Sequence, residues 1–193
     1  LMAFARLPQL QTKNPATCNA FLAEMLAAYP SYMNFAVADE NGNLYCSAIP
    51  FKGPINVADR TYFKMATQLR DFAIGDYQIG RITKRPALNY GYPLRDASGE
   101  LTGVVILVQS LNWLTAALAN VTFPPGAVLI VTDRIGTVLA RIPDADDWIG
   151  KALPEAKVQD GLSDQREGGV FEANDAQGVD RLWAHAPLIA GAD

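Results

Sequence analysis

A short pattern that occurs twice constrains the fold of this chain more than any other feature. An apolar run ending in Asp-x-x-Gly occupies residues 35–42 and again 129–136, an offset of 94 residues, and Pro-Leu recurs at 93–94 and 187–188 with the same offset. Two pairs at one offset predict a duplicated module, although Asp-x-x-Gly is also a common turn and Pro-Leu a common dipeptide. On the duplication reading, the counterpart of 103–109 is expected near position 197, so the second module is shortened and the chain is a fragment of a longer protein.

Composition excludes several classes of protein. The 193 residues carry 16 basic and 20 acidic side chains, a net charge of −4, and contain no long basic run, which argues against a nucleic-acid binder. Half of the residues are hydrophobic and 19% are charged, a globular balance that suits one ordinary domain or two small ones. The longest apolar runs, 103–108 and 127–131, are far shorter than the roughly 18–20 residues of a membrane span. The first residues show no signal-peptide pattern, as is also expected of an exported protein after processing.

The order of predicted elements indicates an α+β fold. Asn14-Pro15 opens an amphipathic helix that Pro30 stops, and a hairpin follows over 32–48. Asp59 is expected to cap a second, short helix. Extended segments at 73–80, 81–94 and 101–109 come next, and Ser110 begins a further helix. Successive strands without intervening long helices favour an antiparallel sheet with helices packed on it.

Known catalytic and metal-binding patterns are missing from the sequence. His185 is the only histidine, and a single histidine in an apolar strand is typical of a packed or interfacial residue. The zinc patterns and the G-x-S-x-G nucleophile elbow do not occur. The segment 75–82 has the two glycines of a P-loop, but Arg81-Ile82 stands where Lys-Ser/Thr would bind phosphate and magnesium. We therefore expect no cofactor, no metal ion and no catalytic residue.

The two cysteines leave two alternatives open. Cys18 lies on the apolar stripe of the first predicted helix, and Cys46 shares a strand face with Leu44 and Ala48. If that helix packs on that face, a disulfide can form. Two buried free thiols are the alternative.

Polar and aromatic residues concentrate between Asp59 and Tyr92. An arginine offers a planar fork for a carboxylate, and aromatic rings can form the walls of a small-molecule pocket. The alternative is an ordinary aromatic core, with Arg60 paired to Asp59 or Asp76 at the surface. The residues that we predict to face one concavity are Arg60, Tyr62, Phe63, Tyr77, Gln78, Arg81, Tyr90 and Tyr92.

Several segments together resemble the double Cache domains, also described as tandem PAS-like sensor domains of bacterial membrane receptors. The most specific are Asp59-Arg60-Thr61-Tyr62-Phe63 and Gly75-Asp76-Tyr77-Gln78-Ile79-Gly80, and weaker matches extend over nearly the whole chain. The resemblance implies one long N-terminal helix as a stalk at 1–30, followed by two PAS-like antiparallel-sheet lobes. These are a membrane-distal ligand-binding lobe at 31–118 and a membrane-proximal lobe at 119–193. It also implies a periplasmic location, which favours a Cys18–Cys46 disulfide.

The resemblance further implies a function and a site. It suggests a small-molecule sensor, tethered to the membrane and homodimeric, attached to a histidine kinase or, alternatively, to a diguanylate cyclase. In amino-acid-sensing relatives, the arginine of this motif binds the ligand carboxylate, a role that falls on Arg60, with Tyr77 as the assisting tyrosine. Those relatives bind the amino group with an aspartate where this chain has Val108 and Gln109, so a carboxylate or another small polar ligand is expected rather than an α-amino acid. A free periplasmic binding protein and a small hydrolase are the rival classes.

Overall fold

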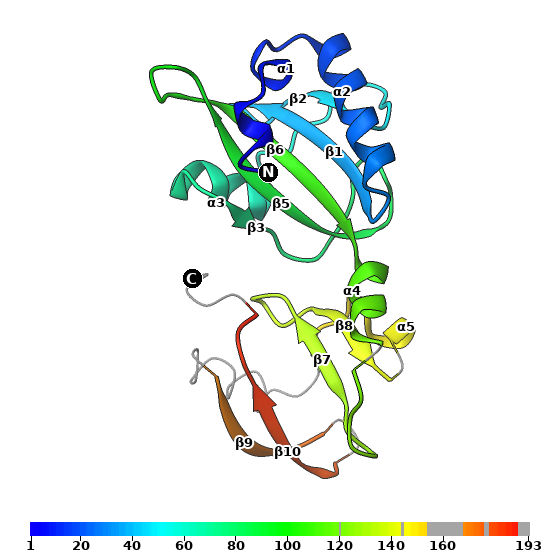
Figure 1. Cartoon of the computed structure of the whole chain (residues 1–193). Coiled ribbons are helices and arrows are strands. Elements are labelled where there is room, and N and C mark those ends of the chain that lie inside the picture. Colours follow the sequence, from blue (N-terminus) through cyan, green and yellow to red (C-terminus); the bar gives the residue numbers. More distant parts are fainter. Residues whose placement is uncertain (120, 144, 154–167, 176–177, 189–193) are drawn as a thin grey trace.

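The chain folds into two parts that are connected by helix α4 (Figure 1). The computed structural model describes residues 1–119, 121–143, 145–153, 168–175 and 178–188. The helices are η1 (Phe4–Arg6), α1 (Pro8–Gln11), α2 (Pro15–Ala28), α3 (Thr61–Leu69), α4 (Leu111–Leu118) and α5 (Ala145–Trp148). The strands are β1 (Tyr32–Asp39), β2 (Leu44–Ser47), β3 (Ala73–Ile74), β4 (Gln78–Ile79), β5 (Pro86–Arg95), β6 (Leu101–Ser110), β7 (Leu129–Thr132), β8 (Val138–Ile142), β9 (Gly169–Asn174) and β10 (Asp180–His185). The paired strands of the described residues are antiparallel, so the predicted α+β class is confirmed.

The first thirty residues are helical, but they do not form the one long helix that was expected. Leu7 and Asn14 have extended backbones, and each is followed by a proline that starts a new helix. Proline suits the first turn of a helix because its missing N–H would have no partner there, whereas in a helix interior it breaks the hydrogen-bond ladder. The predicted helix after Asn14 is confirmed as α2, and the Asn14 side chain accepts hydrogen bonds from Ala16 and Thr17. Among the described residues, no helix has the length and apolar character to span a bilayer.

The first part is built on a six-stranded sheet in the order β2-β1-β6-β5-β3, with β4 also paired to β5. Strand alternation divides its side chains between two faces. Ala36, Ile106 and Val108 belong to the core cluster beneath α3, whereas Val37 and Val105 belong to the cluster beneath α2 and η1. A side chain of this sheet therefore faces either α3 or the N-terminal helices.

A disulfide joins the N-terminal helices to the sheet. Cys18 of α2 and Cys46 of β2 are bonded, with their Cα atoms 6.0 Å apart, and both are fully buried. Beside this bond, the Asn19 side chain accepts a hydrogen bond of 2.8 Å from the backbone N–H of Ser47. Helix α2 is thus held against the edge strand by a covalent and a polar contact.

The sequence repeat is also a structural repeat. In the β1–β2 and β7–β8 hairpins, the Asp N–H donates to the carbonyl four residues on, at 2.9 Å from Asp39 and at 2.9 Å from Asp133. The closing glycines Gly42 and Gly136 have φ angles of 83° and 81°, which strongly favour glycine. The carbonyl oxygen of each of these glycines accepts a hydrogen bond from a backbone N–H of a later loop. Each hairpin also has a register shift just before its turn.

The two parts touch through the segment between β3 and β4. The backbone N–H of Tyr77 donates to the Asp133 carboxylate at 2.9 Å, and Arg134 Nε lies 2.8 Å from Asp76 Oδ1. Asp76 also accepts a 2.6 Å hydrogen bond from Thr61 Oγ1 at the start of α3. The β7–β8 turn is consequently in polar contact with the segment that leads to the candidate site.

Candidate functional site

The candidate site begins where the chain enters α3. Asp59 does not cap this helix, contrary to the sequence expectation. Arg60 occupies the N-cap position without a capping side chain, and the Asp59 carboxylate instead binds Arg81 from the β4–β5 loop. The guanidinium gives this carboxylate two charge-assisted hydrogen bonds, so a distant arginine takes it away from the helix end.

A cavity lies between the start of α3, the α3 face of the sheet and the β4–β5 loop. Its volume is about 30 Å³, close to that of one water molecule. Four predicted residues line it, namely Arg60, Tyr62, Gln78 and Arg81. Three polar residues that we did not predict line it as well, namely Asn34, Thr83 and Asn89.

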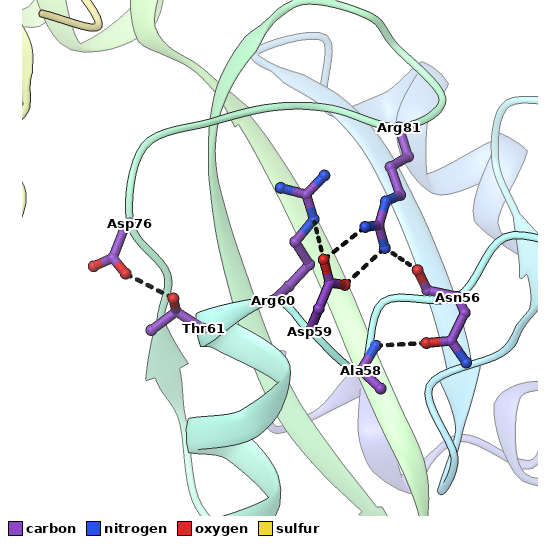
Figure 2. A network of polar contacts seen from close by, with 7 residues as sticks. All are labelled: Asn56, Ala58, Asp59, Arg60, Thr61, Asp76 and Arg81. Atoms are coloured by element: carbon purple, nitrogen blue, oxygen red, sulfur yellow. Dashed lines mark hydrogen bonds and ion pairs between the residues drawn. The ribbon is translucent and has the colours of Figure 1, made fainter.

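The two arginines of the cavity converge on the carboxylate of Asp59 (Figure 2). Arg81 donates to Asp59 Oδ1 at 2.8 Å and to Oδ2 at 2.7 Å, and it also donates to the carbonyl oxygen of Asn56. Arg60 Nε lies 4.0 Å from Asp59 Oδ2, and the Arg60 side chain is 25% exposed. The hydrogen bonds from Arg81 are the main reason why the pKa of Asp59 is lowered. Arg60 is thus the arginine that is less engaged with Asp59.

Buried polar groups form the rest of the lining. Asn34 is satisfied, because its amide donates to Ser47 Oγ at 2.9 Å and its carbonyl accepts from Ser47 and from the Ile49 N–H. Burial raises the pKa of Tyr62 to about 12, against a smaller lowering by a hydrogen bond from Asn89, so the phenol remains neutral at neutral pH. Asn89 is 5% exposed, and its Oδ1 has no hydrogen-bond partner among the described residues.

Four predicted site residues lie elsewhere. Phe63 packs in the core beneath α3. Tyr77 joins an apolar cluster with residues of α4 and β8, and its ring lies so close to Gly150 that a Cβ there would overlap it. Tyr90 and Tyr92 alternate with Asn89 along β5, so they point to the opposite face of the sheet. Period-two alternation along this strand is the signal that could have selected Asn89 in their place.

A larger open groove lies outside the cavity. It has a volume of about 760 Å³ and shares Arg81 and Ile82 with the cavity lining. Lys52 and Lys84 lie on its rim with Arg81, against one acidic side chain, Asp59. The ion pair of Arg81 and Asp59 therefore stands between a predominantly cationic groove and the inner cavity.

Metal-ligating groups do not cluster in the part of the chain that the structure describes. No group of three or more His, Cys, Asp or Glu side chains there has the arrangement of a metal site. His185 lies on β10, with its ring 5.9 Å from that of Phe171.

Comparison with known structures supports the fold. The chain is similar to the extracellular domain of mmHK1S-Z3, assigned as a histidine kinase, with 17% identity over 94% of this chain and 77% of that one and a TM-score of 0.73. It is similar to the sensor domain of the Vibrio cholerae histidine kinase DctB, with 18% identity, coverages of 93% and 77%, and a TM-score of 0.64. It is also similar to the ligand-binding domain of the Pseudomonas fluorescens chemoreceptor CtaA in complex with L-serine, with 23% identity, coverages of 88% and 71%, and a TM-score of 0.63.

The sequence itself defines the family. Comparison with curated proteins finds no significant match. The model of the Cache domain family matches residues 1–190, almost the whole chain. This protein therefore belongs to the Cache domain family.

Proposed function

We propose that this chain is an extracytoplasmic sensing domain of a membrane receptor and that it binds a small carboxylate through Arg60. The observation that carries the proposal is a cavity whose charged lining residues are arginines and whose polar groups are buried. A guanidinium binds a carboxylate through paired, charge-assisted hydrogen bonds. The fold similarity to receptor domains, one of them crystallised with L-serine, supports a small-molecule ligand.

The finer assignments belong to the same proposal. Residues 1–30 form the helical stalk, 31–118 the membrane-distal lobe that binds the ligand, and 119–193 the membrane-proximal lobe. The recurrence of the hairpin hydrogen bonds supports two related lobes. We assign the receptor to the periplasmic side of an inner membrane, as a homodimer with a histidine kinase output, and a diguanylate cyclase is the alternative output. Two similar structures from histidine kinases favour the first.

The rival classes make different predictions. For a free periplasmic binding protein we would expect a doubly wound parallel sheet, whereas the strand pairs of the described residues are antiparallel. A small hydrolase would turn over ester or phosphoester substrates. Turnover that is abolished by changing one carboxylate would replace our proposal with the hydrolase.

Thermal-shift screening against organic acids, amino acids and amines tests the proposal. A carboxylate should raise the melting temperature of the wild type but not that of Arg60→Gln. Arg85→Gln is the matched control, because Arg85 is exposed and lies outside the cavity lining. A ligand that stabilises Arg60→Gln as much as the wild type would remove Arg60 from the site, and stabilisation by amines alone would contradict a carboxylate ligand.

A further inference from the structure

The cavity that Arg60 lines is closed in this structure. Its volume of about 30 Å³ is too small for a carboxylic acid, since even the smallest of these has several non-hydrogen atoms. The groove beyond it has a volume of about 760 Å³, within the range of small-molecule sites, and the two linings share Arg81 and Ile82. The β4–β5 loop, which carries both shared residues, therefore stands between a space large enough for a solute and Arg60.

One side of this boundary is fixed to the body of the fold. In the loop that leads into α3, the Asn56 amide donates to the Asn41 carbonyl at 2.9 Å and to Asn43 Oδ1 at 2.8 Å. The backbone N–H of Val57 donates to the Gly42 carbonyl at 2.8 Å, and the Val57 side chain is buried in the core beneath α3. These contacts tie the loop to the turn of the β1–β2 hairpin, so it is not the part that moves.

The other side of the boundary is the β4–β5 tip, residues 80–85. It is a compact turn, in which Gly80 N–H donates to the Arg85 carbonyl at 3.0 Å and Lys84 N–H donates to the Gly80 carbonyl at 2.9 Å. Because these hydrogen bonds lie within the tip, it keeps them when it moves as a unit.

One arginine holds the β4–β5 tip against the rest of the first part. Arg81 donates to Asp59 Oδ1 at 2.8 Å and to Oδ2 at 2.7 Å, and it also donates to the carbonyl oxygen of Asn56 (Figure 2). In the part of the chain that the structure describes, these are the hydrogen bonds and ion pairs that join the tip to residues outside the β4–β5 hairpin. Ion pairs between partly exposed side chains are weak and screened by salt, so this contact can open.

We propose that the β4–β5 tip is a lid over the Arg60 site and that the pair between Arg81 and Asp59 is its latch. The inference rests on the proposed function, because the site beneath the lid is the one assigned to the carboxylate. A solute carboxylate has the same chemistry as the Asp59 side chain, so it competes for Arg81 as it enters from the groove. Anions therefore open the site more readily than cations do.

The reactivity of a thiol in the cavity measures the opening of the lid. Val108→Cys places a thiol in the cavity lining, and the two native cysteines are bonded to each other. Methyl methanethiosulfonate, a small neutral reagent, modifies this thiol while the cavity is open, so the rate follows the open fraction. Val105→Cys lies on the opposite face of the same strand and reports opening of the sheet itself.

Loss of the latch should accelerate the modification from either side. Asp59→Asn and Arg81→Gln should each raise the rate at the cavity thiol by about fivefold, as for a partly exposed ion pair, and leave the thiol on the opposite face unchanged. Electrostatics alone would move the two variants in opposite directions, because an anion raises and a cation lowers the pKa of a nearby thiol. Arg85→Gln on the same tip and Glu100→Gln on the β5–β6 turn, both exposed, are the matched controls.

Salt gives an independent readout of the latch. Raising NaCl from about 0.1 M to about 1 M shortens the screening length from about 10 Å to about 3 Å. This change should speed modification of the cavity thiol when Asp59 is present but not in Asp59→Asn. Circular dichroism establishes that each variant is folded. Equal rates with and without the latch would overturn the inference, and so would an equal acceleration of the thiol on the opposite face.

Charged reagents test the competition for Arg81. The sulfonatoethyl reagent is an anion and the trimethylammonioethyl reagent is a cation, and each rate is taken relative to that with free cysteine. We expect the anion to react faster with the cavity thiol. An equal or faster reaction of the cation would contradict the link between anions and the latch.

The neutral reagent separates this inference from the proposed function, because it needs no ligand. If the latch variants accelerate modification but no carboxylate stabilises the wild type through Arg60, the lid stands and the carboxylate site is wrong. If a carboxylate stabilises the wild type but not Arg60→Gln, while the latch variants leave the thiol rate unchanged, the carboxylate site stands and the lid is wrong.

Discussion

Reducing the bond between Cys18 and Cys46 should lower the thermal stability of the first part of the molecule. The bond spans a sequence separation of 28 residues. In the chain-entropy model, closing a loop of this length restricts the unfolded chain and stabilises the fold by about 3.6 kcal/mol. Both cysteines are fully buried between α2 and the sheet, so the folded packing already holds them together.

The expected change in melting temperature follows from the entropy of unfolding. At about 2.1 cal/mol/K per residue, the loss of about 3.6 kcal/mol corresponds to about 9 °C if the whole chain unfolds together, and to about 15 °C if residues 1–118 unfold separately. Differential scanning calorimetry with and without dithiothreitol measures this change. The double variant Cys18→Ala, Cys46→Ala should not respond to the reductant. An unchanged melting temperature of the wild type, together with two free thiols before any reductant is added, would refute the reasoning.

Three further changes probe the fold. Gly42→Ala should lower the free energy of unfolding in urea more than Gly99→Ala does. Both glycines have positive φ, at 83° and 87°, but only at Gly42 would the added Cβ approach Ala58 N to 2.6 Å. Equal losses of unfolding free energy would contradict this close approach. Burial raises the pKa of Tyr62 from 10.0 to about 12, so as the pH rises this phenol ionises first in the unfolded chain. The free energy of unfolding should therefore fall between about pH 10 and pH 12, by about 2 kcal/mol more than in Tyr62→Phe. Arg134→Gln removes the contacts of the Arg134 side chain with Asp76, Ile74 and Met65, so limited proteolysis should separate the two parts sooner. An unchanged rate of cleavage would count against a role of these contacts.

In the proposed function, a solute reaches Arg60 through the opening between the groove and the cavity. Since Arg81 and Asp59 both lie at the surface of this opening, with 34% and 60% of their side chains exposed, their ion pair is screened by salt. A lining of mostly cationic groups also attracts anions over a distance set by ionic strength. The attraction favours small anions as the molecules that enter.

Local signals in the sequence were sufficient for most of the elements. Asn14-Pro15 predicts the start of α2 and Ser110 predicts the start of α4, and both side chains accept the capping hydrogen bonds. The Asp-x-x-Gly turns at 39–42 and 133–136 predict two hairpins. These features depend on a few consecutive residues, because a cap or a tight turn is completed within about four positions.

The candidate site depended on contacts between distant residues. The sequence segments were sufficient to select four lining residues, namely Arg60, Tyr62, Gln78 and Arg81. Along a strand, however, the side chains point to alternate faces of the sheet, so Tyr90 was expected in the position that faces the site while Asn89 lies there. The sequence by itself determined the elements, the repeated hairpin and the arginine motif, since each is written in neighbouring residues. Only the tertiary structure decided which carboxylate Arg81 binds and which polar atoms are buried without a partner, because those depend on which loop closes over which face of the sheet.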